Sequence, residues 1–97
     1  MSVRLDKFLK LARLVKRRTA AQEMIELGAV RIEGRACKPA AEVREGTVIE
    51  IAYMNRVLKV RVLCADEALL KRPHTVSWEQ LEEKPVSPEE NPWGDSP

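Results

Sequence analysis

The stretch RLDKFLKLARLVKRRTAAQEMIELGAVRIEGR, residues 4–35, decides the fold of this chain. Thr19 is a natural N-cap for a helix over residues 20–27, because its hydroxyl can accept hydrogen bonds from the exposed amides of the first turn. Gly28 follows at the position where helices commonly end in a left-handed conformation. Upstream, apolar residues at helical spacing predict a first helix over residues 4–14: Leu5, Phe8, Leu9 and Ala12. The two helices are joined by a basic elbow, Lys16-Arg17-Arg18.

After Gly28 the period of the apolar residues changes from helical to alternating. This pattern predicts strands over residues 30–32, 36–38, 48–51 and 57–63, separated by turns at 33–35 and 45–46. The fold class is therefore α+β, with two short helices packed on a small mixed or antiparallel sheet. The expected core consists of apolar side chains from both layers: Leu5, Phe8, Leu9, Ala21, Met24, Ile25, Val30, Ile32, Val48, Ile51 and some of Leu58, Val60 and Val62.

Charge divides the chain into two parts. Residues 1–63 carry fourteen Lys and Arg against seven Asp and Glu, whereas residues 64–97 carry three against eight. We expect one folded domain over residues 1–63 and an acidic, proline-rich tail over residues 64–97. Ser77 and Gln80 form a capping-box pattern, which predicts a short helix over residues 78–83 in this tail. Pro85, Pro88, Pro92 and Pro97 predict disorder around and after that helix.

The sequence offers little for catalysis or for a metal. Cys37 and Cys64 are far apart and His74 is the sole histidine, so a structural zinc site, a cofactor and a catalytic role are not expected. The two cysteines are expected to be free thiols. Neither a signal peptide nor a membrane span is predicted, which favours a cytoplasmic protein without a membrane partner.

A basic surface is the strongest functional signal, and its partner is expected to be RNA. Arginine can hold a phosphate with two parallel hydrogen bonds, and the amides at the start of the second helix add to an anion site beside Arg18. Residues 19–22, TAAQ, are small and poor in hydrogen-bonding groups, which argues against a helix that reads DNA bases. Scarce aromatic residues argue against base stacking, so recognition of RNA shape and backbone remains. The alternative is an ordinary solvated charged face.

Several motifs in order resemble the alpha-L RNA-binding domain first described in ribosomal protein S4. They are RLDKFL at the start of one helix, KRRT at the elbow, Gly28, the turn V-x-I-x-G-R, a Lys-Pro pair and G-x-x-I-x-I. The resemblance covers residues 3 to about 52 and implies the alpha-L fold. Among stand-alone versions, RLDKFLK, RLVKRRTAA and a short strand extension are most similar to the RqcP family of bacterial ribosome-associated quality control.

The resemblance implies a non-catalytic adaptor for stalled large ribosomal subunits. Its partners would be large-subunit rRNA, peptidyl-tRNA and an RqcH-type factor that adds alanine tails. Asp6 would orient a neighbouring arginine. The expected RNA-binding residues, from the resemblance and from the basic surface together, are Arg4, Lys7, Lys10, Lys16, Arg17, Arg18, Arg35 and Lys38.

Three alternatives remain open at this point. One is a factor like heat shock protein 15, which recycles blocked large subunits, although the acidic tail argues against it. The others are an RNA-binding subunit of an RNA-modifying enzyme and a DNA-binding regulator.

Overall fold

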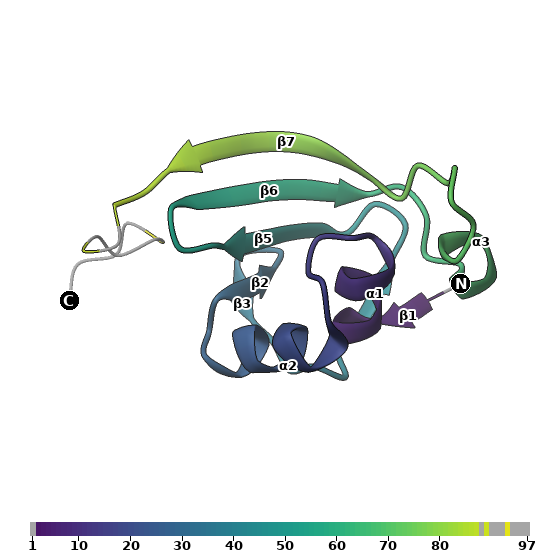
Figure 1. Cartoon of the computed structure of the whole chain (residues 1–97), viewed down its shortest axis with the longest axis horizontal. Helices are drawn as coiled ribbons and strands as arrows, with labels where there is room; N and C mark the ends of the chain where they lie inside the picture. The colour runs from purple at the N-terminus through teal and green to yellow at the C-terminus, as the bar shows by residue number, and fades with distance from the viewer. Residues whose placement is uncertain (1, 88, 90–92, 94–97) are drawn as a thin grey trace.

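A computed structural model of the chain describes residues 2–87, 89 and 93. It confirms the α+β class, because two helices lie against one face of an antiparallel sheet (Figure 1). The elements in chain order are β1 (Ser2–Arg4), α1 (Leu5–Leu11), α2 (Arg18–Glu26), β2 (Val30–Ile32), β3 (Arg35–Ala36), β4 (Glu42–Arg44), β5 (Val48–Ala52), β6 (Arg56–Val62), α3 (Glu67–Leu70) and β7 (Trp78–Pro85).

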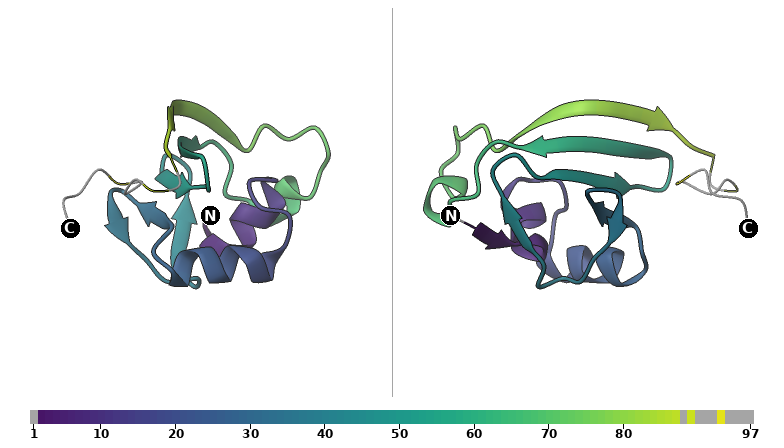
Figure 2. Two further views of the ribbon diagram at one scale, coloured as in Figure 1. Left: turned by 60° about the vertical axis from the view of Figure 1, so that its left-hand side comes forward. Right: turned by 180° about the vertical axis from the view of Figure 1, so that it is seen from behind.

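The main sheet has five strands in the order β3-β2-β5-β6-β7, and every neighbouring pair is antiparallel. Strands β2, β5 and β6 confirm the predicted strands, and the return strand β3 ends earlier than expected, at Ala36. A separate two-stranded sheet pairs β1 with β4, which the sequence did not predict. The views in Figure 2 show α1 and α2 under the main sheet, with α3 beside α1.

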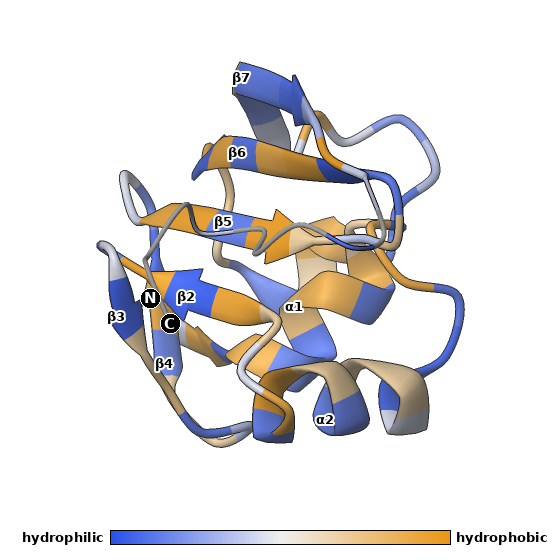
Figure 3. Cartoon of the chain, turned by 90° about the vertical axis from the view of Figure 1, so that its left-hand side faces the viewer, coloured by the Kyte–Doolittle hydropathy of each residue, from blue (hydrophilic) through white to orange (hydrophobic). Residues whose placement is uncertain are grey.

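The core lies between the helices and one face of the main sheet. Phe8 and Leu9 on α1 and Ile25 on α2 are almost completely buried in this layer. On β5 the inward residues are Ile49 and Ile51, so the prediction that Val48 lies in the core is wrong. Neighbouring residues of a strand lie on opposite faces of the sheet. In the register with β6, Ile49 and Ile51 face the core beside Val60 and Leu58, so Val48 faces away from it. Figure 3 shows apolar residues on β5 and β6 and a hydrophilic β7 at the edge.

Both helices end in the same way, although only α2 ends at a glycine. The amides of Gly28 and Ala29 donate to Ile25 and Met24, and Gly28 has φ +81°. In α1 the amides of Arg13 and Leu14 donate to Lys10 and Leu9 in the same arrangement, which is a Schellman motif. Arg13 has φ +63°, so α1 stops at Leu11, earlier than predicted.

The start of α2 also differs from the prediction. The helix begins at Arg18, its N-cap residue is Arg17, and no side chain caps it, so Thr19 lies within the first turn. The backbone carbonyl of Arg17 accepts from the amide of Ala21, so the first hydrogen bond of the helix starts two residues before the predicted N-cap. Arg18 and Gln22 reach across to Asp6 on α1, and this contact between helices holds the first turn in place of a local cap.

The predicted helix over residues 78–83 is wrong, because this segment forms strand β7. The carbonyl of Ser77 accepts from the amides of Leu63 and Cys64, which joins it to the end of β6. Acidic residues on β7 face basic residues on β6: Arg61 pairs with Glu79 at 2.8 Å and Arg56 with Glu83 at 3.7 Å. Opposite charges across a strand pair are stabilising, and a free edge on β6 outweighs the local capping signal.

The outer face of the main sheet carries a row of alternating charges. In register across four strands lie Arg31, Glu50, Lys59 and Glu82. Trp93 lies over this row, with its ring centre 4.3 Å from the guanidinium carbon of Arg31. The row is polar, and its opposite charges cancel, so it adds no net charge to this face. The disorder predicted around Pro88, Pro92 and Pro97 concerns residues outside the described part of the chain.

Candidate nucleic-acid interface

Asp6 is the centre of a polar cluster between α1 and α2. Its side chain is completely buried, yet it accepts hydrogen bonds from four groups. Arg4 donates from Nε and Nη2 at 3.3 and 3.2 Å, and Arg18 donates from Nε at 3.3 Å. Gln22 Nε2 and the backbone amide of Lys7 each donate at 2.8 Å. The carboxylate therefore fixes two guanidinium groups from different elements.

Both arginines of this cluster still face solvent. The side chain of Arg4 is 49% exposed and that of Arg18 is 41% exposed. The contacts among the described residues use only Nε of Arg18, so its two Nη groups are available to an anion. An arginine held by a carboxylate on one edge is oriented for phosphate on the other, which is the geometry expected if Asp6 is an orienting residue.

The electrostatic balance at Asp6 predicts how stability depends on pH. Burial raises the pKa of Asp6, but the hydrogen bonds from Gln22, Arg4, Arg18 and the Lys7 amide outweigh it and leave the pKa below its usual value of 3.8. A lowered folded-state pKa stabilises the fold above pH 3.8, and this stabilisation is lost as the pH falls through the lowered pKa. We expect the Tm of the protein to decrease when the pH is lowered below about 4. The Asp6→Asn variant should lack this decrease, and thermal unfolding at a series of pH values measures both. An equal acid response in both proteins would contradict this balance.

The elbow is exposed, and the loop that leads into it, at Ala12 and Leu14, is tied to the sheet. Lys16 and Arg17 are exposed, and neither has an ion-pair partner within the described residues. The Tyr53 hydroxyl donates to the carbonyl of Leu14 at 2.6 Å, and the Trp78 indole donates to that of Ala12 at 3.1 Å. Burial raises the pKa of Tyr53 although Arg56 opposes this, so the hydroxyl keeps the proton that it donates. The basic side chains of the elbow therefore follow directly after a segment whose position is fixed.

The structure brings some of the other expected residues to this cluster and not others. Lys38 is adjacent, because the carbonyl of Pro39 accepts the amide of Asp6 at 3.2 Å. Lys7 forms an ion pair with Glu67 on α3, which lowers the pKa of Glu67. Arg35 is exposed on β3 at the sheet edge, and no contact among the described residues joins it to Asp6.

Several residues of the surface escaped the sequence analysis. Gln22 gives one of the shortest hydrogen bonds to Asp6, although the two lie sixteen positions apart. Its position one helical turn after Arg18 was the available signal. Arg13, Lys71 and Arg72 form a second basic group together with Lys10, at the other end of α1. Their grouping depends on the path of residues 70–78, which the sequence assigned to a tail.

Within residues 2–87, 89 and 93, no group of three or more His, Cys, Asp or Glu side chains is arranged to hold a metal ion. Cys37 and Cys64 are free thiols, as expected. In the same described part, no helix has the length and apolar character needed to cross a bilayer.

Comparison with known proteins agrees with this geometry. The S4 domain family matches residues 3–49. A curated relative from Halalkalibacterium halodurans, named RQC P-site tRNA stabilizing factor, is 35% identical over 88 residues, which are 91% of this chain and 100% of the relative. A heat shock protein 15 homolog from Aeromonas salmonicida is 38% identical over 71 residues, 73% of this chain but only 54% of the relative. The solved structure of the trimeric heat shock protein 15 of Vibrio cholerae has a TM-score of 0.73 and 26% identity, and covers 84% of this chain and 83% of that one.

The fold and the surface between α1 and α2 thus define an S4-domain protein. The match covers the whole length of the Halalkalibacterium halodurans relative but only about half of the heat shock protein 15 homolog, which decides between these two groups of S4-domain proteins. This chain belongs to the family of RQC P-site tRNA stabilizing factors, which confirms the resemblance to the RqcP family.

Proposed function

We propose that this protein is a non-catalytic, cytoplasmic RNA-binding factor of bacterial ribosome-associated quality control. It binds large ribosomal subunits that retain peptidyl-tRNA, through the elbow and the arginines beside Asp6. The observation that carries the proposal is the buried Asp6 carboxylate, which holds Arg4 and Arg18 at the surface of an S4 domain. The name of its full-length relatives supports a P-site tRNA as one of the RNA partners.

The contacts proposed for this surface are to RNA backbone. Arg4, Lys16, Arg17 and Arg18 are the principal cations, with Lys7 and Lys38 beside them. Lys10, at the far end of α1, and Arg35, on β3, are proposed as more distant contacts. Arginine forks and lysine point charges suit phosphate oxygens. Such contacts follow the position of the backbone and carry no base sequence. Large-subunit rRNA and the peptidyl-tRNA would both offer this chemistry, and an RqcH-type tailing factor would act on the same particle.

A second candidate function is that of a heat shock protein 15-like factor, which recycles blocked large subunits. The similarity of fold to the Vibrio cholerae protein favours it. The partial coverage of the Aeromonas salmonicida relative speaks against it, since nearly half of that protein has no counterpart in the match.

Co-sedimentation with purified large subunits tests the proposal. We expect the protein to sediment with subunits that carry peptidyl-tRNA and to sediment weakly with empty ones, because the tRNA supplies part of the phosphate surface. The log of the affinity should fall with the log of the salt concentration at roughly 0.7 to 0.9 per phosphate contacted. Equal binding to both particles would leave a general rRNA-binding protein, and binding to neither would refute the proposal.

A further inference from the structure

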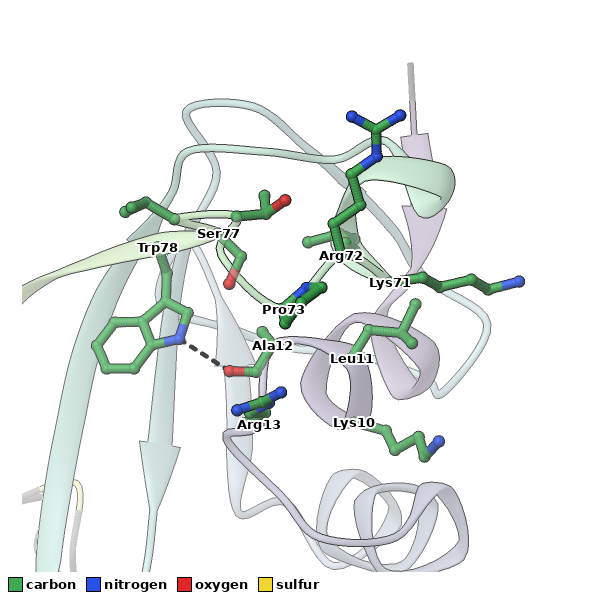
Figure 4. Close-up of a pocket in the computed structure, with 12 residues that line it drawn as sticks. Lys10, Leu11, Ala12, Arg13, Lys71, Arg72, Pro73, Ser77 and Trp78 are labelled. Atoms are coloured by element: carbon green, nitrogen blue, oxygen red, sulfur yellow. Dashed lines mark hydrogen bonds between the residues drawn. The ribbon is translucent and has the colours of Figure 1, made fainter.

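A groove lies at the C-terminal end of α1, away from the Asp6 cluster. Its volume is about 670 Å³, and one side is formed by Lys10, Ala12 and Arg13. The segment from Leu70 to Trp78 forms the other side, so the groove exists only because β7 returns the chain to α1 (Figure 4).

The ionisable side chains that line the groove all carry positive charge: Lys10, Arg13, Lys71 and Arg72. All four residues are exposed, and in Figure 4 Lys10 and Lys71 extend toward the same side. Among the described residues only Lys71 has an ion-pair partner, Glu67 at 3.6 Å. Cations that surround one groove create a local positive potential.

The backbone at Arg13 gives a second, independent reason to assign a function here. Arg13 occupies the left-handed position of a Schellman motif, and Gly28 occupies the same position at the end of α2. A side chain in this conformation costs roughly 1–2 kcal/mol, which glycine avoids. Strain of this kind is found at sites where the side chain has a role. The arginine at this position points to a role for its side chain in the groove.

Hydrogen bonds hold both sides of the groove in position. The Trp78 indole donates to the carbonyl of Ala12 at 3.1 Å, which joins the start of β7 to the end of α1. The Thr75 hydroxyl donates to the carbonyl of Leu69 at 2.6 Å, and the amide of Arg72 donates to the same carbonyl at 3.0 Å. The cations thus project from a largely preorganised surface, which lowers the entropy lost on binding.

We propose that this groove binds the phosphate backbone of a second RNA segment, separate from the one at the elbow. The inference rests on the proposed function, because it extends an RNA-binding surface along α1, a helix about 10 Å long. Lys7, one turn before Lys10, shares the partner Glu67 with Lys71, so basic side chains continue from the Asp6 cluster to the groove. RNA fits better than an acidic protein segment, since a tight protein interface is usually anchored by a large side chain in a pocket. Val76, an apolar side chain exposed in the groove, is small, and the Trp78 indole N–H already donates to Ala12.

The test compares two double variants of the full chain on large subunits that carry peptidyl-tRNA. Lys71→Ala with Arg72→Ala should weaken binding about tenfold and reduce the salt slope by roughly 1.4 to 1.8, as expected for two phosphate contacts. Arg44→Ala with Lys84→Ala removes the same charge elsewhere and should change neither quantity. A groove variant that behaves like this control would overturn the inference while the elbow could still bind RNA. If the unmodified protein does not bind at all, the proposed function itself fails.

Two further measurements test the contribution of Arg13 and the chemical class of the partner. Arg13→Gly should raise Tm by about 4 °C, because strain is relieved, and should weaken binding severalfold. A variant with higher Tm and unchanged affinity would remove Arg13 from the site. A labelled polyglutamate peptide tests for an acidic protein partner. If the groove variant loses affinity for this peptide and keeps its affinity for the subunits, the groove is not an RNA site.

Discussion

Reversal of both exposed elbow charges, Lys16→Glu together with Arg17→Glu, is expected to weaken binding to large subunits that carry peptidyl-tRNA by about a hundredfold, ~2.8 kcal/mol. Each substitution removes a cation without a partner among the described residues and adds repulsion from phosphate. The fold should remain intact, since both side chains are exposed and Arg17 makes no side-chain cap on α2. Quantitative co-sedimentation at about 0.1 M salt measures the loss, and thermal unfolding verifies the fold.

The matched control reverses two exposed cations on other elements, Arg44→Glu with Lys84→Glu, and changes the net charge by the same amount. Affinity close to that of the unmodified protein is expected there. Arg18→Glu is a poorer probe, because its carboxylate would lie beside the buried Asp6 and would change stability as well as binding. Equal losses in the elbow variant and in the control would show that binding follows net charge alone and would exclude a specific elbow site.

Removal of the Asp6 carboxylate, Asp6→Ala, is expected to lower the free energy of unfolding by about 3 kcal/mol. The substitution removes the acceptor of the hydrogen bonds from Arg4, Arg18, Gln22 and the Lys7 amide at a fully buried position. The two guanidinium groups regain some hydration because they are half exposed, which keeps the loss from being larger. For a chain of this size the corresponding fall in Tm is roughly 12–24 °C, measurable by calorimetry.

Glu26→Ala is the matched control, because it removes an exposed carboxylate from α2 and should change stability by less than about 0.5 kcal/mol. Asp6→Asn keeps the side-chain volume and one acceptor oxygen, so its stability should lie between those of the other two. A stable Asp6→Ala protein that still binds RNA normally would contradict both the structural and the orienting role of the carboxylate.

The sequence predicted the parts of the fold that local periodicity encodes. The spacing of Phe8, Leu9 and Ile25 predicted the buried sides of α1 and α2, and Gly28 predicted the end of α2. Glycine at that position avoids the cost of a left-handed side chain, so its meaning is local. For Asp6, the alpha-L resemblance predicted contact with a neighbouring arginine, and the structure has two such contacts. Its role in binding stays a prediction that the variants above test.

The remaining features depend on contacts between distant segments, which local patterns do not contain. Ser77 and Gln80 have the spacing of a capping box, but the open edge of β6 pairs with β7 instead. The end of α1 at Leu11, just before the left-handed Arg13, could not be located from a glycine, because none is present between residues 1 and 27. The groove was missed for both reasons, since it lies between the end of α1 and the segment that enters β7.

The row of alternating charges on the outer sheet face affects how the molecule approaches a polyanion. The signs of Arg31, Glu50, Lys59 and Glu82 cancel along the row, whereas the elbow carries cations that no described neighbour neutralises. Positive charge is therefore concentrated on one side of the molecule, at the elbow. In the field of an RNA particle such an uneven charge distribution favours orientations with that side toward the phosphates, so more encounters begin there. The benefit lies in the association rate, and it diminishes as added salt shortens the range of the field.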